Sequence, residues 1–475
     1  MAQLKFVPIP PHPLDRYRPL LGEERFERIE RIAAEARRDF AGRAIWHVSS
    51  TARGGGVAEI LHSLLPYVRG AGVDTRWVVL REAPEFFAIT KRIHNHMHGD
   101  PGDGGELGEA ERSIYELALA ADAGGLGHLL QEGDVVYLHD PQTAGLVGAM
   151  KELGLSVIWR CHIGVDEPDE LATGAREFLL PYVEGADAYV FSRREYVWEG
   201  LDTERVWLMP PAIDAFSPKN QELDAATVKA ILAAIGLGPD GRRTAPSFVR
   251  GDGTPGRVER RAELLQEARV PAAARVVAQV SRWDRLKDPR GVLELFERFL
   301  DDPAIHLVLA APAADAVADD PEGAVVYGDV AESWRRLPDG VRRRAHLVNL
   351  PMYDLDENGA MVNAIQRRAD VLVQKSVAEG FGLTVAEGMW KGRPVVGSRV
   401  GGIQDQIVDG ESGVLVDDPC DYEAFGREIR ALLDDPARAR AIGEAARRRI
   451  GERFLAVGRL AEYVELVASL VRIPA

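Results

Sequence analysis

The sequence predicts an α/β protein with two successive domains, each built around a doubly wound, largely parallel sheet. Short apolar runs alternate with helical segments, once in each half of the chain, which is typical of parallel sheets with buried strands. At 475 residues the chain is too long for one ordinary hydrophobic core and suits two. No repeat with a period of 20–50 residues is evident, so a solenoid or propeller is not expected.

The first domain is predicted to span residues 1–211, of which 1–42 form an extension ahead of the sheet. Several prolines open the extension, and apolar residues then recur along one side of a helix expected at about residues 20–40. Apolar residues at i, i+3, i+4 and i+7 predict a helix over Val57–Arg69, and Pro66 inside it predicts a kink or an early end. Strands are expected at residues 44–49, 77–80, 135–138, 157–159, 189–191 and 206–209.

The second domain is predicted to span residues 212–453. Residues 236–259 are rich in glycine, proline and basic residues, which favours an exposed, flexible loop or linker, with a functional loop left open. The remaining segment, 454–475, contains a helix expected to end near residue 471. Strands are expected at residues 276–280, 306–310, 325–327, 346–350, 371–373, 395–397 and 414–416.

Composition and charge exclude several classes of protein. Acidic residues outnumber basic ones by 74 to 58, a net charge of −16, which argues against a nucleic-acid binder. The two cysteines, Cys161 and Cys420, suit neither a disulfide framework nor a metal site. Because no run approaches the ~18 apolar residues of a membrane span and no signal-peptide pattern is evident, we expect a cytoplasmic protein.

One stretch, Ser376–Met389, combines a strand end, a glycine turn and a helix start. Gly380 and Gly382 leave backbone N–H groups open to a ligand, and the orphan N–H groups of a helix N-terminus favour an anion. Glu379 and Glu387 bracket this site. The alternative is an ordinary strand-to-helix turn with two solvated glutamates.

Two cations follow the first strand of the second domain. Arg282 and Lys287 lie just beyond the strand expected at 276–280, and ligands of open α/β sheets bind at that edge. Such cations suit a diphosphate. The alternative is a pair of surface charges neutralised by Asp284 and Asp288.

The first domain has its own candidate residues at strand ends. Three glycines, 54–56, precede the helix from Val57 without forming a dinucleotide fingerprint, so a mere tight turn stays open. His162 follows the strand at 157–159, where a lone histidine is more often structural. Asp140 and Gln142 follow the strand at 135–138 and can bind sugar hydroxyls. For Asn95, in a histidine-rich segment, we favour a place near an acceptor over a metal site.

These motifs together resemble a known enzyme family. The ungapped run Glu-Gly-Phe-Gly-Leu-Thr-x-x-Glu-Gly-Met from Glu379 to Met389 resembles the signature of retaining, nucleotide-sugar-dependent glycosyltransferases of family four. Ser281-Arg282 followed by Lys287 resembles the Ser-Arg-x4-Lys pattern of that family. Further segments look like its trehalose synthases, and they include Gly54–Leu64, Glu85–Phe87, His139–Gln142, Arg160–His162 and Met209–Pro211.

The resemblance implies a GT-B fold, in which two Rossmann-like domains face each other across a cleft. The first domain would bind the acceptor, the second would bind the nucleotide sugar, and the helix in 454–475 would cross back to the first. The implied catalytic residues are Arg282 and Lys287 at the diphosphate, Glu379 at the glucose hydroxyls and His162 near the sugar. The implied donor-binding residues are Gly54, Gly55, Gly56, Gly380, Phe381, Gly382, Leu383, Thr384, Glu387 at the ribose and Met352 near the base. The implied acceptor-binding residues are Asp140, Gln142 and Asn95.

The implied reaction is the reversible, retaining transfer of glucose from ADP-glucose or UDP-glucose to glucose, giving trehalose. The favoured mechanism is front-face attack with the leaving phosphate taking the proton, so no general base is assigned. No metal site or cofactor is expected, although Mg2+ can accompany the nucleotide. Nucleic acid and membrane are not expected partners, and a homodimer stays open. Two alternatives remain, namely a trehalose phosphorylase of the same fold and a non-catalytic sugar or nucleotide sensor.

Overall fold

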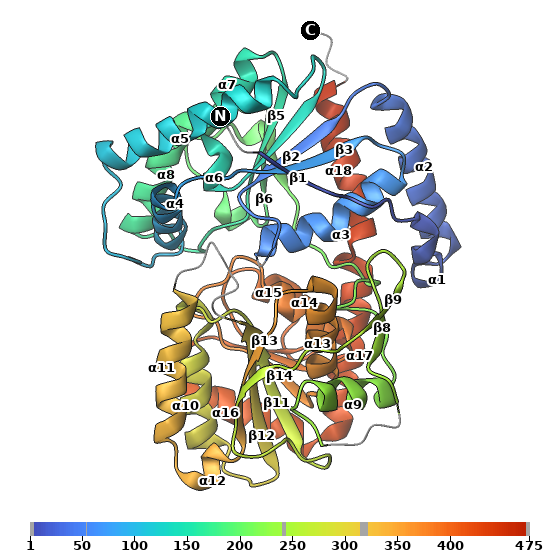
Figure 1. Ribbon diagram of the computed structural model, residues 1–475, viewed down its shortest axis with the longest axis vertical. Coiled ribbons are helices and arrows are strands. Elements are labelled where there is room, and N and C mark those ends of the chain that lie inside the picture. The colour runs from blue at the N-terminus through green and yellow to red at the C-terminus, as the bar shows by residue number, and fades with distance from the viewer. Residues whose placement is uncertain (1–3, 54, 240–243, 314–321, 472–475) are drawn as a thin grey trace. The chain divides into compact units, whose positions relative to one another are not determined.

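The computed structural model describes residues 4–53, 55–239, 244–313 and 322–471. The chain forms two compact units, shown in Figure 1. The first contains the residues up to Ala212 together with those from Ala456 onward, and the second is Ile213–Leu455. Across the described residues, no helix is both long enough and apolar enough to cross a membrane.

The first unit contains a seven-stranded sheet in the order β1-β3-β2-β4-β5-β6-β7. β1 pairs antiparallel with β3, and all other neighbours are parallel. The central strands are buried on both faces, as their continuous apolar runs predict. The strands are β1 Lys5–Val7, β2 Ile45–Ser49, β3 Thr75–Val79, β4 Val135–His139, β5 Ser156–Cys161, β6 Ala188–Phe191 and β7 Val206–Leu208.

Helices cover both faces of this first sheet (Figure 1). The last helix, α18, packs against α2 and α3, so the C-terminal end of the chain completes the first unit. The helices are α1 Arg18–Leu21, α2 Glu23–Asp39, α3 Gly56–Gly70, α4 Pro84–His96, α5 Glu109–Gly127, α6 Pro141–Ala144, α7 Val147–Glu152, α8 Glu170–Val183 and α18 Ala456–Val471.

Of the two alternatives predicted at Pro66, a kink or an early end of helix α3, the early end does not occur. The helix continues to Gly70 with Pro66 inside it. Burial of Leu61, Leu65 and Val68 along one face favours continuation by more than the one hydrogen bond that proline removes. The carbonyl of Pro66 also accepts a hydrogen bond from the His12 N–H at 2.8 Å.

The second unit contains a seven-stranded sheet in the order β10-β13-β12-β11-β14-β15-β16. Only the β10–β13 pair is antiparallel in this sheet. The strands are β10 Glu263–Leu265, β11 Arg275–Val280, β12 Ile305–Pro312, β13 Ala345–Leu350, β14 Val371–Gln374, β15 Val395–Ser398 and β16 Val414–Val416. The helices are α9 Ala225–Ala234, α10 Pro289–Phe299, α11 Gly323–Arg336, α12 Asp339–Arg342, α13 Leu355–Arg368, α14 Leu383–Trp390, α15 Ile403–Gln406, α16 Tyr422–Asp434 and α17 Pro436–Arg453.

The strand predicted at residues 325–327 is wrong, because this segment lies in helix α11. Val326, Val330 and Trp334 are buried four residues apart, the spacing of a helical face. Three apolar residues in a row were too short a run to distinguish a strand from a helix.

The segment 236–259 is also more ordered than a flexible loop or linker. Residues 240–243 lie outside the described residues, but β8 Ser247–Val249 and β9 Pro255–Arg257 form an antiparallel hairpin. Arg250, at the hairpin turn, pairs with Asp354 at 2.7 Å, which caps helix α13. An ion pair anchors a segment that composition alone marked as unstructured.

Candidate functional site

In the second unit, the glycine turn lies between β14 and the start of α14. Gly382 has φ +85° and is the residue that precedes the helix. Most L-residues avoid this conformation. A Cβ on Gly382 would also lie 3.3 Å from the Glu379 side chain and from Ile403. Glycine is therefore required here both by the backbone and by the neighbouring side chains.

The buried side chain of Gln406 holds the turn from behind. Its amide donates hydrogen bonds to the carbonyl groups of Phe381 at 2.6 Å and Gly382 at 3.2 Å. Because C=O and N–H point in opposite directions across a trans peptide, the N–H groups of Gly382 and Leu383 point away from Gln406. The turn thus presents its donors at the N-terminus of α14, where an anion is favoured.

Glu379 is clamped by partners from two strand ends. Lys287, in the short 3-10 helix Arg285–Lys287 after β11, lies 2.8 Å from one carboxylate oxygen. The hydroxyl of Ser376 donates to the other oxygen at 3.2 Å. The fold therefore brings together Glu379 and Lys287, two residues singled out from the sequence 92 positions apart.

Polar residues beyond Glu379 extend this network to the helix. The side-chain amide of Gln374 donates to the Ser376 hydroxyl at 3.0 Å. The Thr384 hydroxyl donates to the side-chain oxygen of Gln374 at 3.0 Å. Gln374 and Ser376 were not predicted as site residues. Their signal was their place immediately after a buried strand, where polar side chains are otherwise unexpected.

Arg282 and Lys287 have different acidic neighbours. The guanidinium of Arg282 lies 3.1 Å from Asp284, as the surface-charge alternative expected. Asp288 forms its ion pair with the buried Lys375, so Lys287 is directed to Glu379. The side chain of Arg282 is 30% exposed.

Glu387 lies one turn inside α14 and is 2% exposed. Lys219 lies 3.4 Å from one of its oxygens, and the Gln366 amide donates to the other at 3.2 Å. The buried ammonium of Lys391 donates to the Glu387 carbonyl at 3.1 Å, and burial lowers the pKa of Lys391 to about 7. The side chain of Glu379 is only 10% exposed, so the alternative of two solvated glutamates is wrong.

Met352 follows strand β13, at the same carboxyl edge of the second sheet. It is half-buried, and Asn358 of α13 donates to the carbonyl of the preceding Pro351 at 3.1 Å. The backbone at this strand end is thereby held by the neighbouring helix.

In the first unit, the glycine loop precedes helix α3. Gly54 lies outside the described residues, whereas Gly55 caps the helix and Gly56 begins it. A Cβ on Gly56 would meet nothing within 4 Å in the part of the chain that the structure describes, and one on Gly55 would meet only Thr51, at 3.6 Å. Internal packing therefore does not explain these glycines, whereas close approach of a ligand would.

Asp140 and His162 meet at the ends of β4 and β5. Asp140 has φ +64° and ψ −177°, a backbone conformation that is almost exclusive to glycine. Its carboxylate accepts a hydrogen bond from the backbone N–H of His162 at 2.7 Å. Burial raises the pKa of Asp140 to about 7, against the opposing effects of that hydrogen bond and of Arg160.

The two other predicted acceptor residues lie on neighbouring helices. Gln142 is in α6 and Asn95 in α4, and these helices pack together. Asn95 is buried, and its side-chain oxygen lies 3.3 Å from the ring of His94. Within the residues that are described, no group of three or more His, Cys, Asp or Glu side chains is arranged to hold a metal.

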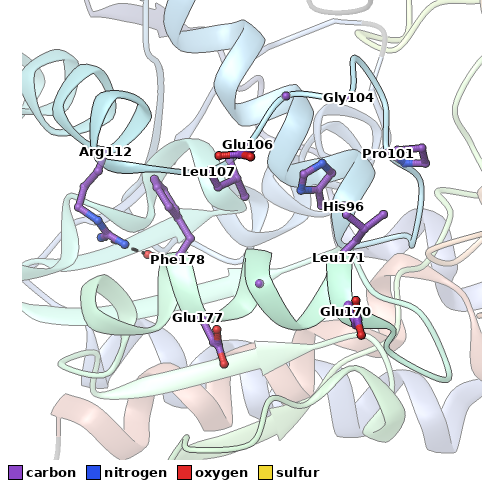
Figure 2. A pocket seen from close by; sticks show the side chains of 12 residues that line it. His96, Pro101, Gly104, Glu106, Leu107, Arg112, Glu170, Leu171, Glu177 and Phe178 are labelled. Carbon is purple, nitrogen blue, oxygen red and sulfur yellow. Dashed lines mark hydrogen bonds between the residues drawn. The ribbon is translucent and has the colours of Figure 1, made fainter.

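A cavity of about 530 Å³ lies elsewhere in the first unit, between α4, α5, α8 and the loop at residues 101–107 (Figure 2). Arg112 reaches across it and donates to the carbonyl of Phe178 and to the Tyr182 hydroxyl. His96, from the histidine-rich segment singled out in the sequence, is among the residues that line it.

Comparison with known proteins identifies the class. The family model for group 1 glycosyl transferases matches residues 355–449, the part that contains the glycine turn and Glu387. The solved structure of trehalose-6-phosphate synthase OtsA superposes with a TM-score of 0.67 at 14% identity, covering 91% of this chain and all of that one. Anabaena HepE, solved with UDP and glucose, superposes with a TM-score of 0.62 at 13% identity, covering 90% of this chain and all of that one. The fold and the site thus define a glycosyltransferase with the GT-B fold.

The family within that class follows from closer relatives. The model for the N-terminal domain of trehalose synthase matches residues 47–198. The trehalose synthase of Pyrococcus horikoshii is 34% identical over 458 residues, 96% of each chain, and that of Rubrobacter xylanophilus is 34% identical over 459 residues with the same coverage. The trehalose phosphorylase of Pleurotus pulmonarius is 26% identical, covering 97% of this chain but 61% of that protein. The chain belongs to the trehalose synthase family.

Proposed function

We propose that this glycosyltransferase transfers glucose, with retention, from a nucleoside-diphosphate glucose to free glucose, and that it also runs the reaction backwards from trehalose. The observation that carries the proposal is the arrangement of Glu379, whose carboxylate is held by Lys287 and Ser376 beside the glycine turn before α14. Such a carboxylate can accept hydrogen bonds from sugar hydroxyls while the turn and the lysine face a diphosphate.

The second unit is proposed to bind the donor. Glu379 holds the glucose hydroxyls, and Glu387 accepts hydrogen bonds from the ribose. The N–H groups of the turn, from Gly380 to Thr384, bind sugar and diphosphate together with Arg282 and Lys287. Met352 and its neighbours contact the base, for which we propose adenine or uracil.

The first unit is proposed to bind the acceptor through Asp140, Gln142 and Asn95. His162 contacts a sugar hydroxyl, and glycines 54–56 allow the sugar and phosphates to approach the start of α3.

The proposed chemistry requires no protein base. The acceptor hydroxyl attacks the anomeric carbon on the face from which the diphosphate leaves, and the bond from that carbon to the phosphate oxygen breaks. The leaving phosphate takes the hydroxyl proton. Arg282 and Lys287 stabilise the charge that develops on the leaving group, and removal of one such group typically costs ~10²–10³ in rate.

Trehalose phosphorolysis is the second candidate, and the 26% identity to a trehalose phosphorylase supports it. In that reaction inorganic phosphate takes the place of the nucleotide diphosphate. A phosphorylase would have no ribose for Glu387, yet this carboxylate is buried and held by two neighbours, Lys219 and Gln366. We therefore favour the nucleotide-dependent reaction.

Incubation of the protein with trehalose and either ADP, UDP or phosphate separates these reactions. We expect nucleoside-diphosphate glucose and free glucose with a nucleotide, in equal amounts whether or not EDTA is added. Glucose 1-phosphate formed with phosphate alone would contradict the proposal, and a non-catalytic sensor would form neither product. A Lys287→Ala variant is the control for contaminating activity, because it should lose ~10²–10³ of the rate.

A further inference from the structure

Three histidines from adjacent strands of the first unit form a buried chain with a tyrosine of the last helix. His47 lies on β2, His139 ends β4, and His162 follows β5, so the β2-β4-β5 order places the three rings in sequence. Tyr463 of α18 reaches the first ring. Each ring in this chain stacks on the next, with centroids 5.3–5.8 Å apart.

The hydrogen bonds of this chain are continuous. The Tyr463 hydroxyl lies 2.9 Å from Nε2 of His47, whose Nδ1 lies 3.0 Å from Nε2 of His139. Nδ1 of His139 in turn lies 3.2 Å from Nε2 of His162. Nδ1 of His162 is buried and has no hydrogen-bond partner among the described residues.

A neutral chain of this kind allows two proton arrangements. A neutral imidazole has one donor and one acceptor nitrogen, and both nitrogens of His47 and of His139 are engaged. The three rings therefore carry their protons either all on Nε2 or all on Nδ1. His162 presents an acceptor at Nδ1 in the first arrangement and a donor in the second.

Burial keeps the rings neutral. It lowers the pKa of His47 to about 3, with Arg160 adding to the effect, and it holds the pKa values of His139 and His162 well below the ordinary histidine range. Charged rings, which would break the donor–acceptor alternation, are thus excluded near neutral pH.

The His162 end favours the first arrangement. Nδ1 of His162 is buried without a hydrogen-bond partner among the described residues, and a buried lone pair costs less than a buried orphan N–H. In this arrangement the Tyr463 oxygen accepts from Nε2–H of His47.

We infer that Tyr463, His47 and His139 are positioning residues that hold the His162 ring and set its tautomer, so that His162 offers an acceptor nitrogen to a sugar hydroxyl. The inference rests on the proposed function in taking His162 as a sugar-contacting residue. It makes the C-terminal helix a part of the reaction machinery as well as of the fold.

Tyr463→Phe tests the inference, with Tyr137→Phe as its matched control. Tyr137 lies in the same stack, with ring centroids 4.9 Å from His47 and 5.0 Å from His139. Its buried hydroxyl has no hydrogen-bond partner in the described structure. Both variants delete one buried hydroxyl from one aromatic stack, but only the first removes a link of the chain.

In 15N NMR spectra of histidine-labelled protein, we expect all three rings of the parent to carry the proton on Nε2. Tyr463→Phe should give His162 a mixture of both tautomers, and Tyr137→Phe should leave the parent spectrum unchanged. We further expect kcat to fall about 3- to 10-fold in Tyr463→Phe, the effect of one hydrogen bond. The KM for nucleotide should stay at the parent value.

An unchanged His162 tautomer in Tyr463→Phe, or an equal loss of kcat in both variants, would overturn the inference. The hydrogen-bonded series from Tyr463 to His162 would then have a packing role only. The spectra require no turnover. They therefore decide this inference even if the reaction proposed above proves to be a different one.

Discussion

The two glutamates that bracket the glycine turn have different surroundings and so suit different tasks. Glu379 pairs with Lys287, a residue of the proposed diphosphate site. Glu387 is deeper, between Lys219 and Gln366, and its backbone is held by Lys391. A carboxylate beside a lysine is a strong acceptor for two hydroxyls, as a ribose would require.

Glu387→Gln should weaken the binding of ADP or UDP by about 10-fold while leaving the affinity for glucose unchanged. Hydrogen bonds to a charged group contribute about 1.5–3 kcal/mol, and glutamine keeps one acceptor of the carboxylate. Calorimetric titrations with nucleotide and with glucose measure both effects. Glu294→Gln on the exposed surface of α10 is the charge-matched control, and equal losses for nucleotide and glucose would refute the ribose assignment.

The turn before α14 functions as one element, because its shape is imposed from three directions. Gly382 provides the left-handed backbone, and Gln406 binds the carbonyl groups behind it. Gly402 allows the turn to pack closely, since a Cβ there would lie 2.5 Å from Cα of Phe381. The position of Glu379 depends on this packing as much as on its own ion pair.

Gly382→Ala should lower the rate about 10- to 100-fold, because a shift of about 1 Å in a catalytic group can cost that much. Gly410→Ala is the matched control. Its φ is +75°, similar to that of Gly382, but a Cβ there would meet nothing within 4 Å among the described residues. Both variants should lose about 1–2 kcal/mol of stability through backbone strain, which urea denaturation measures. Steady-state kinetics then shows the effect of displacing the turn, which is expected only in Gly382→Ala. Comparable rates in both variants would contradict the prediction.

Across the whole molecule, buried histidines link stability to pH in both units. Burial lowers the pKa of His346 to about 3 and that of His306 to about 4 in the second unit, beside the three rings of the first unit. Two buried carboxyl groups have the opposite effect on the pH dependence of stability. Burial raises the pKa of Asp140 to about 7 and that of Asp122 to about 8.

The free energy of unfolding should therefore fall as the pH decreases from about 6.5 towards 5. In this range the unfolded chain binds protons on histidines that stay neutral in the folded state, at about 1.4 kcal/mol per pH unit for each one. The carboxyl groups are protonated in the folded state and not in the unfolded state between about pH 4 and 7, so they offset part of this loss.

Denaturant unfolding at pH 7 and pH 5 measures this dependence for each transition. His346→Gln should reduce the slope by about 1.4 kcal/mol per pH unit, because glutamine does not titrate. Equal or greater stability at pH 5 than at pH 7 would show that the carboxyl groups dominate.

The sequence by itself determined the two-sheet α/β architecture and most of the strands, and the resemblance of its motifs to a known family indicated the glycosyltransferase class. The architecture and the strands depend on local patterns, since a buried strand needs a continuous apolar run. The prediction of a strand at residues 325–327 was wrong because the apolar run was too short, and composition did not reveal the hairpin 247–257.

Only the tertiary structure decided which side chains share an environment. His47 and Tyr463 are separated by 416 residues, and Lys219 and Glu387 by 168. No local pattern marks either pair. Hydrogen bonding and desolvation depend on distance in space, and the order of strands in the sheet and the docking of α18 set those distances.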